Sequence, residues 1–235
     1  MDVGLIARSF VRTLGQIHDP RFRKVFFLGV GLTIALLIAV TAGLMWVLNW
    51  LVGDDATLPL IGQVSWLGEL ASAGGFLVMS VASIFLMVPV ASAVTSLFLE
   101  EVADAVEDEH YPWQPEVPGV PILDTVIDAL GFTGVLILAN ILALVLYLVF
   151  PPFAPLIFWS MNGFLLGREY FTLAALRREG REGARALRRR HLPTIWLAGT
   201  LMAIPLSIPI VNLMIPILGA ASFTHIYNGV VARGR

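Results

Sequence analysis

The sequence contains no cysteine, and charged residues make up only 14% of it, whereas 57% of the residues are hydrophobic. The absence of thiols excludes disulfides, thiolate nucleophiles and thiolate metal ligands. The scarcity of charge excludes an ordinary water-soluble domain, in which charged side chains are spread over the whole surface. The composition therefore indicates an all-α integral membrane protein.

Four stretches carry no Lys, Arg, Asp or Glu: residues 25–53, 70–99, 129–167 and 191–228. Each exceeds the roughly 20 residues that a helix needs to cross a bilayer, and none shows the short alternating segments of a membrane β-barrel. Proline should kink the second stretch at Pro89. It interrupts the last two stretches more strongly, at Pro151, Pro152, Pro155, Pro205, Pro209 and Pro216. Because proline kinks or breaks helices, we expect the last two stretches not to continue straight.

The first 24 residues differ from the apolar stretches because they mix apolar and basic positions. Helical spacing places Val3, Ile6, Phe10, Leu14 and Ile17 on one stripe, which predicts an amphipathic helix lying on the membrane surface. A flexible basic leader is the alternative. Asp19 followed by Pro20 is a helix-start signal for the first apolar stretch.

The distribution of Lys and Arg predicts the topology. Five lie before residue 25, none in residues 54–69 or 100–128, eight in residues 168–190, and two at the end of the chain. Cytoplasmic segments collect Lys and Arg, so residues 54–69 read as an external loop. If the third apolar stretch crossed the membrane once, the eight arginines would lie outside. The third and fourth stretches must therefore enter from the cytoplasm and return to it.

The predicted architecture is two long transmembrane helices, two proline-broken helical hairpins and an N-terminal amphipathic helix. Residues 156–167 reach only roughly 18 Å as a helix before the charges resume, so we expect hemipenetrating hairpins. The non-helical tips would have to be buried in protein or face water. Residues 1–235 form a single membrane domain with five parts: an interfacial helix and basic turn (1–24), two spans with an acidic cytoplasmic segment (25–128), a first hairpin (129–178), a basic connector (179–191) and a second hairpin (192–235).

Four segments resemble a known family. They are the Asp19–Lys24 stretch DPRFRK, residues 97–100 (LFLE), residues 162–170 (NGFLLGREY) and residues 208–216 (IPIVNLMIP). The chain resembles the CysZ-type sulfate permeases of bacteria, which are related to the etoposide-induced membrane proteins of eukaryotes. The resemblance implies sulfate uptake for cysteine biosynthesis, assembly as dimers or higher oligomers, and the same architecture that the charge distribution predicts.

The resemblance also implies a sulfate site at the start of the first membrane helix, where the family carries Gly-aliphatic-Arg-Arg. The corresponding residues are Arg21, Phe22, Arg23 and Lys24, so Arg21 replaces the glycine. Cations at a helix N-terminus oppose the macrodipole, and a bound oxyanion would reconcile them. The alternative is that they are ordinary cytoplasmic flanking charges or contacts to lipid headgroups.

Ionisable groups at the membrane boundary are the next candidates. Arg168 and Glu169 would form either a structural pair or a relay, and His225 is more often hydrogen-bonded than a relay. Glu100, Asp104 and Asp108 share one helix face and need counter-charge. We expect pairing with the arginines of residues 177–190 rather than a metal site, because His and Cys do not cluster there.

No nucleotide-binding motif and no nucleophile with a base is evident, so we expect neither an enzyme nor a cofactor. The arginines of residues 177–190 are expected to meet anionic lipid rather than nucleic acid. The functional hypothesis is a sulfate transporter of the bacterial inner membrane, with both termini cytoplasmic, membrane lipids as neighbours and a homo-oligomeric assembly. A non-transporting membrane scaffold or regulator of the same fold is the alternative.

Overall fold

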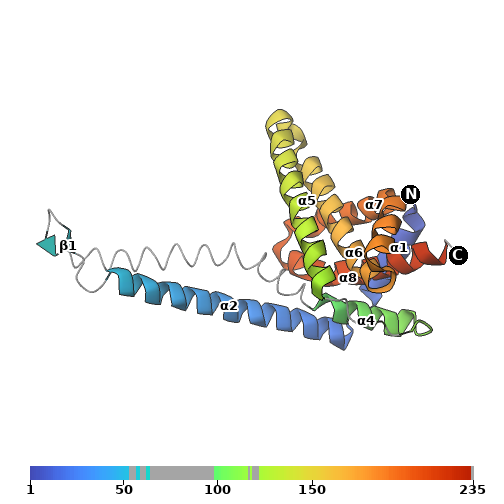
Figure 1. Ribbon diagram of the computed structural model, residues 1–235, viewed down its shortest axis with the longest axis horizontal. Helices are drawn as coiled ribbons and strands as arrows, with labels where there is room; N and C mark the ends of the chain where they lie inside the picture. Colours follow the sequence, from blue (N-terminus) through green and yellow to red (C-terminus); the bar gives the residue numbers. More distant parts are fainter. Residues whose placement is uncertain (53–56, 59–61, 64–97, 116, 118–121, 234–235) are drawn as a thin grey trace. The chain divides into compact units, whose positions relative to one another are not determined.

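The computed structural model describes residues 1–52, 57–58, 62–63, 98–115, 117 and 122–233. The described chain is almost entirely helical (Figure 1), as the composition predicts. Its helices are α1 (Val3–Gly15), α2 (Pro20–Val52), α4 (Leu99–His110), α5 (Ile122–Val149), α6 (Ala154–Arg190), α7 (Leu192–Ala203) and α8 (Pro209–Ala232). Two 3-10 turns, η1 (Pro151–Phe153) and η2 (Ile204–Ser207), precede α6 and α8.

The chain divides into two compact units, one formed by Met1–Phe26 with Phe98–Arg235 and the other by Phe27–Leu97. In the second unit, α2 continues to Val52, and β1 (Thr57–Leu58) pairs antiparallel with β2 (Gly62–Gln63). This short pairing lies within the predicted external loop. The predicted second span, residues 70–99 with Pro89, lies outside the described residues except for its last two positions.

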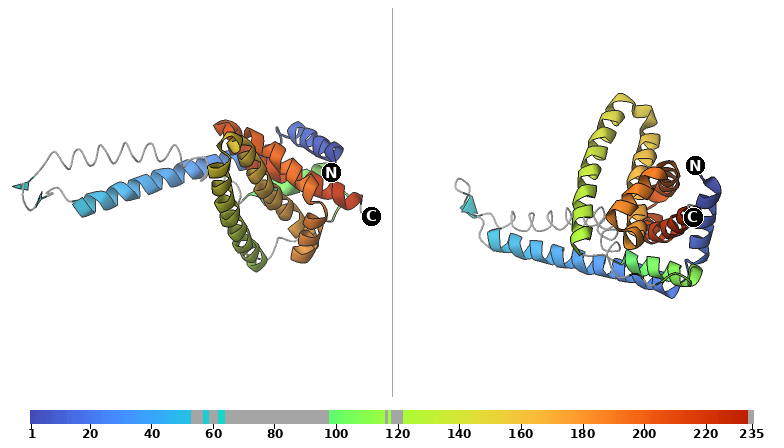
Figure 2. Two further views of the ribbon diagram at one scale, coloured as in Figure 1. Left: turned by 90° about the horizontal axis from the view of Figure 1, so that it is seen from above. Right: turned by 45° about the vertical axis from the view of Figure 1, so that its right-hand side comes forward.

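Helix α8 is the centre of the first unit and packs against α1, α4 and α6 (Figure 2). Its buried side chains include Phe223, Ile226 and Tyr227, which join the core formed with Phe171 and Val106. The apolar positions of α8 occur all round the helix, and helices of that pattern are buried in a large core or in a membrane. The sequence pattern alone does not distinguish the two, and the packing shows that protein covers most of α8.

Helices α6 and α7 lie in close contact because glycine faces glycine. A Cβ atom on Gly199 of α7 would stand 2.0 Å from the carbonyl oxygen of Gly163 in α6, and one on Gly167 would stand 2.6 Å from the carbonyl oxygen of Ile195. Small residues allow this approach between membrane helices, where packing rather than water exclusion drives association. Gly180 interrupts α6 with φ 66°, a left-handed conformation that favours glycine.

The chain reverses direction at η1, so that α5 and α6 run side by side (Figures 1 and 2). Pro151 and Pro152 form this turn because proline ends one helix and starts the next. Likewise, η2 with Pro205 separates α7 from α8, while Pro216 stays inside α8. The prolines therefore interrupt both stretches, as the sequence predicts.

Three helical segments among the described residues are long and apolar enough to cross a membrane: Pro20–Val40, Gly131–Val149 and Val211–Ala232. The first two are mostly uncovered by other parts of the chain, and large apolar side chains such as Ile38, Leu138 and Leu148 are more than half exposed. Water would not tolerate so continuous an apolar surface. The chain is therefore a helical membrane protein.

Helix α1 is amphipathic, but its apolar stripe does not face the core as a whole. Ile6 is buried against α8 together with Leu5, whereas Val3 is 63% and Leu14 is 57% exposed. The buried face is completed by the small polar side chain of Thr13, whose hydroxyl accepts a hydrogen bond from Ser222. The exposed apolar side chains suit the predicted position at a membrane surface.

Candidate anion-binding site

The N-terminus of α2 carries the cluster for which the sequence predicts a sulfate site. Asp19 caps the helix, since its Oδ1 accepts a hydrogen bond of 2.7 Å from the backbone N–H of Arg21, and its backbone oxygen accepts one from the N–H of Arg23. Gln16 donates to the other carboxylate oxygen at 3.0 Å. A carboxylate of the chain therefore already occupies part of the positive end of this helix, where an external anion would bind.

The four predicted site residues point in different directions. Phe22 is only 2% exposed, so its side chain belongs to the core rather than to the surface of a site. Arg21 and Lys24 are exposed and reach acids of α4, with Arg21 Nη1 at 2.6 Å from Asp108 and Lys24 Nζ at 2.6 Å from Glu101. Arg23 is exposed, and its side chain has no ion-pair partner among the described residues. Arg23 is thus the cation most open to an anion.

The acids of α4 are also paired from α6. Arg178 donates two hydrogen bonds to the carboxylate of Glu107, Nη2 to Oε2 at 2.7 Å and Nε to Oε1 at 3.1 Å. These hydrogen bonds raise the pKa of Arg178. Arg177 forms an ion pair with Asp104. The predicted pairing of the acidic segment with the arginines of residues 177–190 is therefore confirmed at Arg177 and Arg178.

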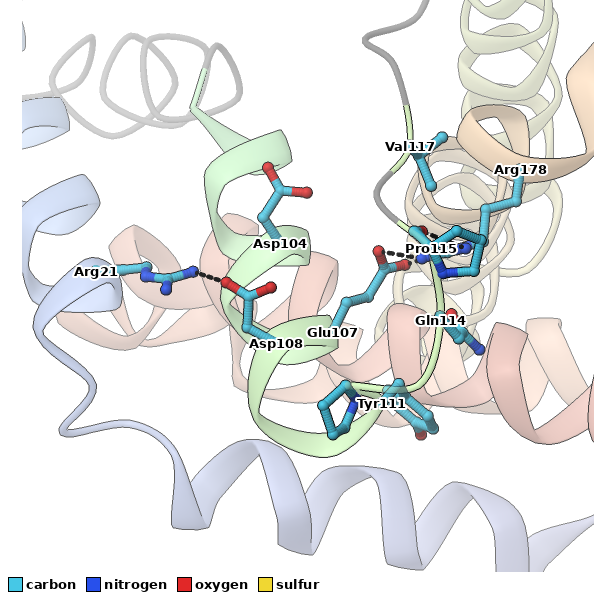
Figure 3. Close-up of a pocket in the computed structure, with 10 residues that line it drawn as sticks. Arg21, Asp104, Glu107, Asp108, Tyr111, Gln114, Pro115, Val117 and Arg178 are labelled. Carbon is cyan, nitrogen blue, oxygen red and sulfur yellow. Dashed lines mark hydrogen bonds and ion pairs between the residues drawn. The ribbon is translucent and has the colours of Figure 1, made fainter.

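A cavity of about 510 Å³ opens between these two sets of ion pairs (Figure 3). Its lining includes two arginines, Arg21 and Arg178, and three acids, Asp104, Glu107 and Asp108. The acids outnumber the cations, so the cavity itself disfavours a dianion. The cations available to sulfate are therefore those that reach beyond it, Arg23 and Lys24.

Arg168 and Glu169, the second predicted pair, lie near the middle of α6. The guanidinium of Arg168 lies over the ring of Phe132 in α5, 5.0 Å from its centroid. This cation–π contact attaches α6 to α5. It favours the structural interpretation of Arg168 over a relay.

A polar group that the sequence analysis did not identify lies where α4 ends against α8. The hydroxyl of Tyr111 lies 2.9 Å from Nδ1 of His225, which agrees with the expectation that His225 is hydrogen-bonded. Gln114 donates to the side-chain oxygen of Asn228 at 2.8 Å, and burial raises the pKa of Tyr111. These partners are 114 positions apart in the chain, so no local sequence pattern could have joined them.

No group of three or more His, Asp or Glu in the described part of the chain is arranged to hold a metal ion. Four of the six acids of α4 instead form ion pairs with four basic side chains, Arg21, Lys24, Arg177 and Arg178. The chemistry that these contacts support is electrostatic binding and exchange of ions.

Comparison with protein families identifies one match. The family model described as "Sulfate transporter CysZ/Etoposide-induced protein 2.4" matches residues 9–216. These residues include the basic cluster, the acidic helix and most of the helical segments that surround them. Comparisons with curated proteins and with solved structures found no match.

Proposed function

Because the chain belongs to the sulfate transporter CysZ/etoposide-induced protein 2.4 family, we propose that it carries sulfate across the inner membrane of a bacterium into the cytoplasm. There the ion would supply sulfur assimilation and cysteine biosynthesis. The observation that carries the proposal is the family match, which spans the exposed basic cluster at the start of α2. The family is one of transporters, and the proposal assigns this chain no enzymatic step.

The proposed sulfate contacts are Arg23 and Lys24, with Arg21 at the edge of the site. Arg23 is exposed, and the side chain of Lys24 is 63% exposed in its pair with Glu101. Ion pairs so exposed are worth about 0–1 kcal/mol, so a dianion can draw Lys24 away from Glu101. Phe22 would hold the cluster in place from the core, where its side chain is buried.

This exchange also gives the site a means of release. When sulfate leaves, Glu101 and Asp108 again neutralise Lys24 and Arg21, so that of these three cations only Arg23 lacks an ion-pair partner among the described residues. A site that alternates between an internal carboxylate and an external oxyanion binds its ion weakly, and a transport pathway requires such weak binding because the ion must also leave.

We further propose the membrane arrangement of two long spans and two hemipenetrating hairpins, with both termini in the cytoplasm. The uneven distribution of Lys and Arg supports this topology. The reversal at η1 fits a hairpin that enters and returns on one side, and η2 interrupts the last apolar stretch where the second turn is proposed. On this topology residues 1–235 act as one membrane domain with the five parts given above.

A homo-oligomer, dimeric or larger, would complete the structure. The side chains of η1 are exposed, and non-helical backbone at membrane depth must be covered by protein or face water. A second copy could cover this turn and, with it, enclose a path for the ion. Lipid would cover the remaining apolar surface.

Sulfate binding to the purified chain tests the proposed site. We expect equilibrium dialysis with labelled sulfate to show binding that the double variant Arg23→Ala/Lys24→Ala loses by a factor of ten or more. The matched control is Arg185→Ala/Arg189→Ala, which removes two exposed arginines from α6. Equal losses of sulfate binding in both double variants would mean that the loss comes from the change in net charge and not from the proposed site. No measurable binding by the unmodified chain would favour a non-transporting scaffold or regulator of the same fold.

Cysteine accessibility tests the proposed topology, since the natural chain has no thiol to interfere. Gly180 is a poor position because its φ of 66° strains any side chain. Ala186 is exposed on the same basic segment, and its substitution leaves every arginine in place. We expect Ala186→Cys to react with a membrane-impermeant maleimide only after the cells are opened. Labelling from outside would overturn the topology.

A further inference from the structure

A second cavity, of about 270 Å³, lies between α1, the residues that follow α4, and α8. It is separate in charge and position from the cluster at the start of α2. The polar and basic side chains that line it are Arg8, Ser9, Arg12, Tyr111, His225, Asn228 and Arg233.

The charge of this cavity is of one sign. Three arginines contribute to its wall, and the described residues that line it include no carboxylate. Arg233 is paired with Asp2, and Arg8 uses its Nε for the backbone oxygen of Gly4 at 3.1 Å. Arg12 also interacts with the hydroxyl of Tyr111 through its guanidinium. The terminal N–H groups of Arg8 and the remaining donors of Arg12 are left for a ligand. The cavity beside Glu107 has the reverse balance, with three acids and two arginines.

A buried histidine in the wall lacks a hydrogen-bond partner. His225 is only 2% exposed. Its Nδ1 is used by the Tyr111 hydroxyl at 2.9 Å, but its Nε2 has no partner in the described part of the chain. When Tyr111 donates to Nδ1, the neutral ring carries its proton on Nε2, which then needs an acceptor. An unpaired buried donor is costly, and native structures rarely leave one.

We propose that this cavity binds a tetrahedral oxyanion, either a free ion such as sulfate or the phosphate of an anionic lipid headgroup. Arg8 and Arg12 stand four residues apart on α1 and provide forked donors that fit such an ion. His225 supplies the buried donor. The exposed apolar side chains of α1, Val3, Val11 and Leu14, would hold the cavity at the level of the headgroups.

The proposed site would connect α1 to α8. The proposal does not depend on whether the chain transports sulfate. Its ligand would bridge Arg8 and Arg12 on α1 to His225 and Asn228 on α8, stabilising the packing of these helices. A ligand that binds the folded state raises its stability by mass action, so binding can be read as both affinity and thermal stability.

The experiment uses the full chain with Arg23→Ala/Lys24→Ala, so that the cluster at the start of α2 cannot contribute. In one arm, labelled sulfate is titrated against a background of chloride at constant ionic strength. In the other arm, native mass spectrometry counts bound short-chain phosphatidylglycerol, with short-chain phosphatidylcholine as the zwitterionic comparison. Each arm compares Arg12→Gln and Arg8→Gln with the matched control Arg189→Gln, an exposed arginine on α6.

We expect Arg12→Gln to weaken binding at least tenfold, Arg8→Gln to weaken it less, and Arg189→Gln to leave it unchanged. If Arg12→Gln and Arg8→Gln weaken the binding of sulfate, the ligand is a free ion. If they weaken the binding of phosphatidylglycerol alone, the ligand is a lipid headgroup. If neither ligand binds, or if all three variants bind alike, the proposal is wrong. Because Arg8 is exposed and makes only the hydrogen bond to Gly4 within the described chain, Arg8→Gln provides a folded variant even if Arg12→Gln does not fold.

Discussion

Acids of helix α4 form ion pairs with two basic regions that differ in burial. On the α6 side, Arg177 is 6% and Arg178 is 14% exposed, whereas at the start of α2, Arg21 is 46% and Lys24 is 63% exposed. Figure 3 shows one pair from each region, Arg178 with Glu107 and Arg21 with Asp108. The charges and the distances are similar, but the surroundings are not. Water screens the second set and hardly reaches the pair of Arg178 with Glu107, although Asp104 beside Arg177 is 53% exposed. The buried pair of Arg178 with Glu107 therefore holds the fold, while the exposed pairs at the start of α2 can be exchanged for a ligand.

The largest expected effect comes from breaking a buried pair. Arg178→Ala leaves the Glu107 carboxylate 10% exposed and without its two hydrogen bonds. Removal of one partner from a buried pair costs about 3–5 kcal/mol. We expect a large fall in the midpoint of thermal unfolding in detergent, which circular dichroism can follow.

Two variants control for this result. Arg189→Ala removes an exposed arginine from the same helix and should change stability by less than about 0.5 kcal/mol. The double variant Arg178→Met/Glu107→Leu removes both charges and should recover most of the loss. If Arg178→Ala unfolds at the temperature of the unmodified chain, the distinction between the two regions fails.

A smaller effect is expected when an exposed acid is neutralised. Glu101→Gln frees Lys24 from its carboxylate partner, so sulfate no longer competes with an internal anion. An exposed pair of this kind is worth up to about 1 kcal/mol, which corresponds to a gain in sulfate affinity of up to about fivefold. Isothermal titration measures the change, and Glu182→Gln, an exposed acid of α6, is the matched control. An unchanged or weaker affinity would place sulfate away from Lys24.

The smallest effect is expected for the stability of Arg21→Gln. This change removes the pair with Asp108, whose side chain is 63% exposed. We expect a loss of no more than about 1 kcal/mol, and less as salt is added. Denaturation at low and high salt tests this expectation. A loss comparable with that of Arg178→Ala would make the pair at the start of α2 structural.

The helical membrane class and several helix boundaries could be predicted from the sequence because membrane insertion depends on local properties. Charge-free stretches predict helices, Asp19-Pro20 predicts the start of α2, and Pro151-Pro152 predicts a turn, and the structure has each of these features. The sequence predicts that Arg178 pairs with an acid of residues 100–109, but complementary charge does not specify which of these acids it contacts.

The remaining features depend on packing between distant segments. Helical spacing grouped Val3, Ile6 and Leu14, yet α1 buries Ser9 and Thr13 against α8 and exposes Val3 and Leu14. Apolar side chains suit both lipid and the core, so hydrophobicity does not separate the two faces of a membrane helix. The contact of Tyr111 with His225 could not be predicted either, because Tyr111 follows α4 and His225 lies in α8, 114 positions further along the chain.

Sulfate flux into liposomes that contain the purified chain tests most directly whether the exposed cluster at the start of α2 serves transport. We predict uptake by the unmodified chain, a loss of about tenfold or more in Arg23→Ala/Lys24→Ala, and normal uptake in Arg185→Ala/Arg189→Ala, which loses the same charge from exposed positions of α6. Equal uptake by all three, or no uptake by the unmodified chain, would contradict the claim that the exposed cluster at the start of α2 serves sulfate transport.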